Sequence, residues 1–121
     1  MSTIDNFNNQ RDTYNQILAK YANQEQKRFF GLDAATYQDK GHLNVKSKEL
    51  LGFVASLVLR CDDCILYHLI GCHKAGVTSE ELAEAVQIGM LVGGSITIPH
   101  IRRAMKVWDE ELVATSAAKA A

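Results

Sequence analysis

The chain has 121 residues, a formal net charge of −1 at neutral pH and a hydrophobic content of 47%. One domain is expected at this length, because domains most often contain about 100–150 residues. The balanced charge gives no electrostatic case for binding nucleic acid or a membrane surface. Its three cysteines, an odd number, argue against a disulfide-stapled secreted scaffold.

The N-terminus and the apolar runs favour a cytoplasmic protein. The opening stretch is polar and has no apolar core of a signal peptide. The longest apolar run, Leu50–Leu59, is far shorter than the roughly 20 residues that a membrane span needs. Ser2 and the absence of a C-terminal cysteine leave no lipidation pattern. In such a compartment thiols are kept reduced.

The predicted elements are helices from the beginning of the chain. Apolar residues at helical spacing predict a first amphipathic helix over residues 4–27. Residues 29–43 have no clear period and contain two glycines, so we expect a connector there. Its Phe29-Phe30 pair is too apolar to remain exposed and is expected to pack on another surface.

Four further helices are predicted in the rest of the chain. A second helix over 45–60 is apolar on nearly all sides, as a central helix would be, and a third spans 62–74. The capping box that starts at Thr78 opens a fourth helix, and Pro99 lies in the first turn of a fifth.

No segment alternates as a strand would, so the predicted class is an all-α helical bundle. We divide the chain into an N-terminal arm over 1–43, a helical core over 44–113 and a frayed tail over 114–121.

Cysteine and histidine side chains share one stripe of the predicted third helix. At 100° per residue, Cys61, Cys64 and His68 point to the same side, with the imidazole one turn beyond the second sulfur. A helix N-terminus favours the thiolate, and a flexible first turn would let the two sulfurs close a disulfide. Asp62 and Asp63 oppose thiolate formation, so a base is needed and His68 is the candidate.

Two other interpretations of this stripe stay open. Free cysteine is a common small core residue, and a lone histidine is often only packed in a core. The first interpretation is therefore that these side chains are only packed in the core. The second is a zinc site, since Cys72 also lies on the stripe. However, Cys61 and Cys72 are about 16 Å apart along the axis, so one tetrahedral ion cannot use all four side chains. A zinc site on Cys64, His68 and Cys72 would need ligands from another chain.

Glu49 precedes Cys61 by twelve residues, and this Glu-x(11)-Cys-x-x-Cys-x-x-x-His spacing resembles the signature of a known family. It is similar to the alkyl hydroperoxidase D-like branch of the carboxymuconolactone decarboxylase superfamily. The surrounding segments agree over about residues 44–108: KELLGFVASLVLRCDDCILYHL, AGVTSEEL and LVGGSITIPHIRRA.

The resemblance implies an all-helical fold, an obligate homo-oligomer (trimer or hexamer) and thiol-dependent peroxidase or disulfide-exchange activity. By position, Cys64 would react with peroxide, while Cys61 would be the resolving sulfur and the more exposed one. His68 would be the base, joined to Glu49 in a proton relay. The substrate would be a hydroperoxide or a disulfide, and a dithiol, in some members a lipoyl-bearing protein, would supply electrons. No metal or organic cofactor is implied.

The residues alone do not pair Glu49 with His68. Two antiparallel helices joined near Arg60 would place them about 18 Å and about 10 Å from the turn, which is an imperfect axial match. The sequence also departs from the family, which often has a histidine where Asp63 stands, and a negative neighbour raises a thiol pKa.

Two other functions remain possible interpretations. One is a non-redox decarboxylase-type enzyme on a small lactone or acid, with His68, Glu49 and His100 as acid–base groups. The superfamily's lactone decarboxylases lack the cysteine pair, which argues against it. The other is a non-catalytic helical assembly or redox sensor. Cys72 is surplus to the pair and is expected to be buried and inert.

Overall fold

Six α-helices build the computed structural model, which describes residues 2–115. They are α1 (Thr3–Tyr21), α2 (Gln24–Thr36), α3 (Val45–Leu59), α4 (Asp62–Lys74), α5 (Ser79–Gly93) and α6 (Ile98–Val107). A 3₁₀ turn, η1 (Ser95–Thr97), precedes α6, and a π-helical turn, η2 (Trp108–Val113), continues it. These residues contain no strand, which confirms the all-α class. The predicted tail lies outside the described residues from position 116 onward.

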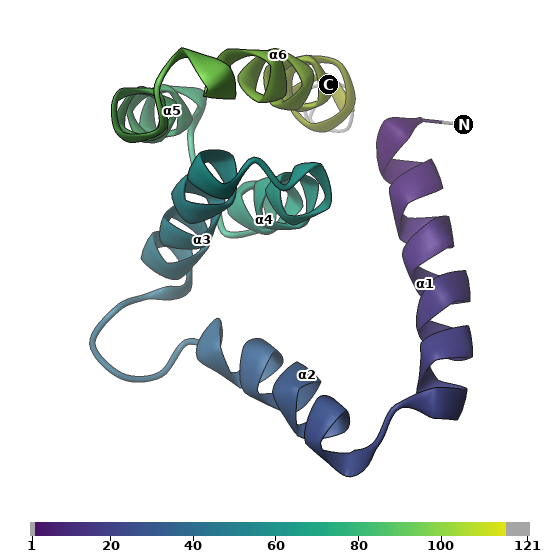
Figure 1. Ribbon diagram of the computed structural model, residues 1–121. Coiled ribbons are helices and arrows are strands. Elements are labelled where there is room, and N and C mark those ends of the chain that lie inside the picture. The colour runs from purple at the N-terminus through teal and green to yellow at the C-terminus, as the bar shows by residue number, and fades with distance from the viewer. Residues whose placement is uncertain (1, 116–121) are drawn as a thin grey trace.

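The helices from α3 onward form a bundle, and α1 and α2 form an arm that extends from it (Figure 1). Within residues 2–115, no helix combines the length and the hydropathy that crossing a membrane requires. The arm is fastened at its start, where the backbone N–H of Ile4 donates to Oε1 of Glu111 in η2 at 2.9 Å.

The prediction of one helix over 4–27 followed by a connector is wrong. The chain turns at Ala22, whose backbone is extended, and Asn23 then starts α2 with a reciprocal capping box to Gln26. These side-chain bonds supply partners for the first amide groups of a new helix. Gly31 does not interrupt α2, because a glycine in an exposed helix costs only about 1 kcal/mol relative to alanine.

The hairpin of α3 and α4 agrees with the prediction to within one residue. Arg60 ends α3 in the left-handed conformation with φ of 59°, and its N–H donates to backbone carbonyls of the last turn. Cys61 follows with an extended backbone and is the N-cap of α4. The two helices are therefore joined by a two-residue turn, and the cysteine motif begins at that turn.

The core fills the space between α3, α4, α5, α6 and η2. Phe53, Leu57, Leu69 and Leu82 are completely buried there, and Trp108 adds its ring from η2. The arm contributes little to this core, and Phe7 is its only described buried residue.

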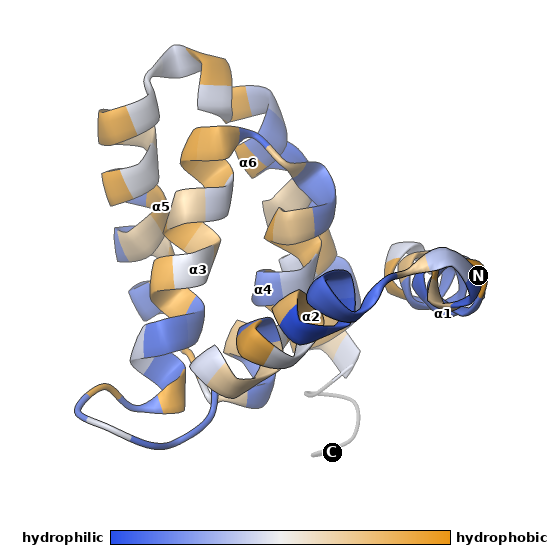
Figure 2. Cartoon of the chain, turned by 60° about the horizontal axis from the view of Figure 1, so that its bottom comes forward, coloured by the Kyte–Doolittle hydropathy of each residue, from blue (hydrophilic) through white to orange (hydrophobic). Residues whose placement is uncertain are grey.

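Large apolar side chains are exposed on the arm, on α5 and on η1. Figure 2 shows how hydrophobic residues are distributed along α3 and α5. Phe29 and Phe30 are 66% and 50% exposed, so the expected packing of this pair is not provided within one chain.

Candidate active site

The cysteine pair lies at the start of α4. Cys61 and Cys64 form a disulfide with a Cα–Cα separation of 5.2 Å, and the backbone N–H of Cys64 donates to Sγ of Cys61 at 3.2 Å. The N-cap position explains why the bond can form, because the extended backbone of Cys61 leaves the regular helix spacing. The structure thus bears out that these two sulfurs can form a pair.

The expected order of exposure is wrong in the described chain. Cys64 is exposed, whereas Cys61 is half-buried. The reason is local, since the Cys61 side chain folds back over the first turn to cap it and Cys64 lies one turn on, at the surface.

Glu49 and His68 form a buried pair between α3 and α4. Oε2 of Glu49 lies 2.9 Å from Nδ1 of His68, and each residue is 8% exposed. An ionised carboxylate can only accept, so the geometry has Nδ1–H donating and Nε2 carrying the lone pair of the neutral ring. The structure therefore brings together the two residues that the axial estimate left unmatched.

Two glycines make room for this pair. A Cβ atom at Gly71 of α4 would lie 2.5 Å from Cδ of Glu49, and one at Gly52 of α3 would lie 2.7 Å from Cε1 of His68. Glu49 thus opposes Gly71, and His68 opposes Gly52. Each side chain occupies the volume that an ordinary residue on the facing helix would fill.

Two tyrosines contact the imidazole, and the sequence interpretation named neither of them as a site residue. The hydroxyl of Tyr37, at the end of α2, is 3.4 Å from Nε2 of His68, and the two ring centroids are 4.8 Å apart. Tyr67 packs edge-on against the same ring at 5.2 Å. No local pattern marks Tyr37, because it comes from the segment that the sequence presented as an irregular connector.

Cys64 and His68 line one pocket of about 290 Å³ between the arm and α4. Its walls include Phe7, Phe29, Phe30 and Tyr67, together with the charged side chains Arg11, Asp33 and Asp63. The Arg11 guanidinium lies 4.8 Å from the centre of the Tyr67 ring, within cation–π range. A small organic molecule in this pocket could reach both the sulfur and the base.

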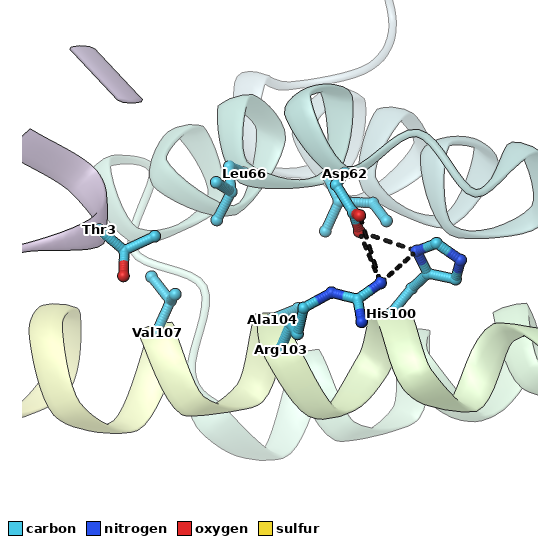
Figure 3. Close-up of a pocket in the computed structure, with 8 residues that line it drawn as sticks. Thr3, Asp62, Leu66, His100, Arg103, Ala104 and Val107 are labelled. Atoms are coloured by element: carbon cyan, nitrogen blue, oxygen red, sulfur yellow. Dashed lines mark hydrogen bonds and ion pairs between the residues drawn. The ribbon is translucent and has the colours of Figure 1, made fainter. Parts of the chain in front are cut away.

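Asp62, between the two cysteines, is held by α6. Nδ1 of His100 lies 2.7 Å from Oδ1 of Asp62, and Nη2 of Arg103 lies 3.2 Å from Oδ2, as Figure 3 shows. Burial raises the pKa of Asp62, but the hydrogen bond from His100 and the positive charge of Arg103 outweigh it and lower that pKa below its usual value. His100 is therefore tied to α4, and the two basic groups offset a charge that would oppose a neighbouring thiolate.

Cys72 is buried without a disulfide, as expected. Burial, and to a smaller degree the charge of Glu49, raises the pKa of its thiol to about 12. Such a thiol stays protonated at neutral pH and is a poor nucleophile. Within the described part of the chain, no three histidine, cysteine or acidic side chains are grouped as metal ligands.

Known proteins resemble this chain in sequence and in structure. The sequence model of the carboxymuconolactone decarboxylase family matches residues 24–110. An uncharacterised protein of Cupriavidus necator is 32% identical over 81 residues, which cover 67% of this chain and 71% of that protein.

Two crystal structures of one Thermotoga maritima protein match with TM-scores of 0.82 and 0.86 at 50% and 46% identity. The first alignment covers 87% of this chain and 88% of the Thermotoga maritima chain, and the second covers 96% and 98%. That protein is described as a carboxymuconolactone decarboxylase family protein with a suggested part in an antioxidative response. An apo structure of a family member from Legionella pneumophila matches with a TM-score of 0.69 at 26% identity. The alignment covers 88% of this chain and 96% of the Legionella chain.

Proposed function

This chain belongs to the carboxymuconolactone decarboxylase family, and on that basis we propose that it is a cytoplasmic thiol-dependent peroxidase or disulfide reductase. The observation that carries the proposal is the arrangement around one pocket: a cysteine pair able to form a disulfide, beside a buried histidine–carboxylate pair. The suggested antioxidative part of the Thermotoga maritima protein, half of whose aligned residues are identical, supports the same chemistry.

The proposed reaction starts from the dithiol. Cys64 gives its proton to Nε2 of His68, and the thiolate attacks the outer oxygen of a hydroperoxide. The O–O bond breaks, the alcohol leaves with the proton from the imidazolium, and Cys64 becomes a sulfenic acid. The thiol of Cys61 then attacks that sulfur, water leaves, and the disulfide forms.

Glu49 stabilises the charged imidazolium during the first step, since its carboxylate faces Nδ1 at 2.9 Å. A dithiol reductant, such as a lipoyl group on a partner protein, returns two electrons and two protons to the cysteine pair and leaves as a disulfide. Cys64 is the exposed residue of the pair, which favours access of a reductant there, while Cys61 keeps the proposed resolving role.

We also propose that the working form is a homo-oligomer, a trimer or a hexamer. Apolar side chains on the arm and on α5 are exposed in the single chain, among them Tyr21 at 81%, Leu91 at 84% and Val92 at 68%. Monomeric proteins rarely leave such surfaces in contact with water. Because the arm forms part of the pocket wall, burial of the arm against another subunit would also complete the site.

The proposal is tested by peroxide consumption with a dithiol reductant. Cys64→Ser should abolish turnover, and His68→Ala should lower it at least 100-fold, in the range expected for general-base catalysis. Cys72→Ala, which removes the buried third thiol, should keep wild-type turnover. Wild-type turnover in Cys64→Ser would contradict the proposal. Lactone or acid turnover that survives alkylation of Cys61 and Cys64 would favour a non-redox enzyme instead.

A further inference from the structure

The base candidate His68 has a side-chain partner that lies outside the sequence motif. Tyr37 precedes His68 by 31 positions, and its hydroxyl faces Nε2 at 3.4 Å, a long hydrogen bond. The two rings are also in contact, with an interplanar angle of 46°. Both ring nitrogens therefore face a defined group: Nδ1 faces Glu49, and Nε2 faces Tyr37.

The position of Tyr37 is fixed by contacts of the segment that follows it. Nζ of Lys48, in the first turn of α3, donates to the backbone oxygens of Gln38 at 2.7 Å and Lys40 at 3.0 Å. Lys48 is the chain neighbour of Glu49. Of these adjacent residues of α3, Glu49 is one partner of the imidazole, and Lys48 bonds to the backbone just after the other partner, Tyr37.

The charges around the ring determine which group donates. The carboxylate of Glu49 accepts from Nδ1–H, so Nε2 of the neutral ring is an acceptor. Burial first, and then the negative charges of Asp33 and Glu49, raise the pKa of Tyr37, so its hydroxyl keeps its proton at neutral pH. The phenol therefore donates to Nε2.

The geometry points to Tyr37 as a positioning residue for the base. Its hydroxyl holds His68 in the tautomer whose Nε2 is basic and keeps that nitrogen paired while the cysteines form a disulfide. The catalytic meaning of this role rests on the proposed function. After reduction, the proton from Cys64 goes to the same nitrogen. The Tyr37 hydroxyl keeps its own proton and turns from donating to Nε2 to accepting from Nε2–H.

Imidazole ¹⁵N NMR of the oxidised protein at one pH near 8 tests the contact itself. Tyr37→Phe should move the Nε2 resonance of His68 downfield, toward that of a pyridine-type nitrogen without a hydrogen bond. Tyr67→Phe is the matched control, because it also removes a hydroxyl from a ring that packs on His68, and it should leave the resonance in place. An unchanged resonance in Tyr37→Phe would overturn the inference, as would a protonated Nε2 in the wild type.

Alkylation of Cys64 in the dithiol form, mapped by mass spectrometry, tests the consequence without any peroxide. We expect Tyr37→Phe to slow alkylation roughly 3- to 10-fold at neutral pH, because the imidazolium formed by proton transfer from Cys64 loses the hydroxyl that accepts from Nε2–H, about one hydrogen bond. Tyr14→Phe on the exposed face of α1 should not slow it. Wild-type alkylation in Tyr37→Phe would overturn the role of Tyr37 even if peroxide is consumed. Slowed alkylation in a protein that consumes no peroxide would instead retain that role and reject the proposed function.

Discussion

Gly71 of α4 lies so close to Glu49 of α3 that a methyl group on its Cα would overlap the carboxylate, 2.5 Å from Cδ. Likewise, a methyl group on the Cα of Gly52 in α3 would overlap the ring of His68 in α4. The buried acid–base pair therefore depends on two residues that have no side chain. Both lie within residues 44–108, the range that resembles the family, but neither belongs to the Glu-Cys-Cys-His spacing.

Gly71→Ala should destabilise the fold and separate Glu49 from His68. The added methyl group must displace a buried carboxylate, and overpacking of this kind costs about 1–3 kcal/mol in the free energy of unfolding. Urea denaturation measures the cost. Gly31→Ala is the control, because its Cβ in exposed α2 would meet no atom within 4 Å, and it should raise stability by roughly 0.5–1 kcal/mol. Equal stability of Gly71→Ala and wild type would contradict the tight fit.

Glu49→Gln should lower the reactivity of Cys64 far more than it lowers stability. The amide has the shape of the carboxylate but cannot stabilise the imidazolium by charge, so we expect at least a tenfold slower reaction with peroxide. Stopped-flow measurement of a single oxidation gives the rate. Glu80→Gln, in the exposed first turn of α5, is the matched control and should react as the wild type does. A wild-type rate in Glu49→Gln would remove the carboxylate from the relay.

Arg103→Met should slow alkylation of reduced Cys61 about 2- to 5-fold at low salt, because only His100 would then offset the charge of Asp62 beside the thiol. The effect should shrink as salt is added, since the groups are largely exposed. Arg102 is an exposed neighbour with no bond to Asp62 among those described, so Cys61 in Arg102→Met should be alkylated at the wild-type rate. An equal effect of both substitutions would show only a change in net charge.

The arm should loosen in acid through Glu111. Burial raises the pKa of this carboxyl. The hydrogen bonds from the backbone N–H of Ile4 and from neighbouring groups of the arm lower the pKa by more than burial raises it, so the folded pKa lies below the usual value. Its contribution to holding the arm is therefore present above the usual glutamate pKa and is lost as pH falls through the lowered one.

Hydrogen-exchange protection of the first turns of α1 is the measurement for this contact. It should decline below about pH 4 and should already be low at neutral pH in Glu111→Gln. Glu110→Gln, which loses only its exposed pairing with Lys106, should keep the protection. Full protection in Glu111→Gln would show that other contacts hold the arm.

The sequence predicted helices where the signals were local. The third predicted helix, 62–74, has the bounds of α4, and the capping box at Thr78 opens α5 as expected. The turn at Ala22 was missed because residues 23–28, NQEQKR, are all polar and contain no glycine or proline that would mark a break. The capping box of Asn23 and Gln26, which starts a new helix there, also consists of polar residues and does not alter the apolar spacing.

The candidate site was predictable where residues share one helix. The shared stripe of Cys61, Cys64 and His68 follows from helical geometry, but the Glu49–His68 contact depends on how closely α3 and α4 approach. That approach is set by glycines on the facing helix, a tertiary property that no periodicity reveals. Tyr37 reaches the imidazole from a third element, which places it beyond any local pattern.

Trapping of sulfenic acid after one equivalent of hydroperoxide tests the central claim most directly. With Cys61 replaced by serine, the sulfenic acid on Cys64 has no resolving thiol, so a dimedone adduct should appear at Cys64 in the peptide mass spectrum. Cys64→Ser should give no adduct, and the wild type should show a peptide two hydrogens lighter that contains both cysteines. An adduct at Cys61 or Cys72, or none in Cys61→Ser, would contradict the account.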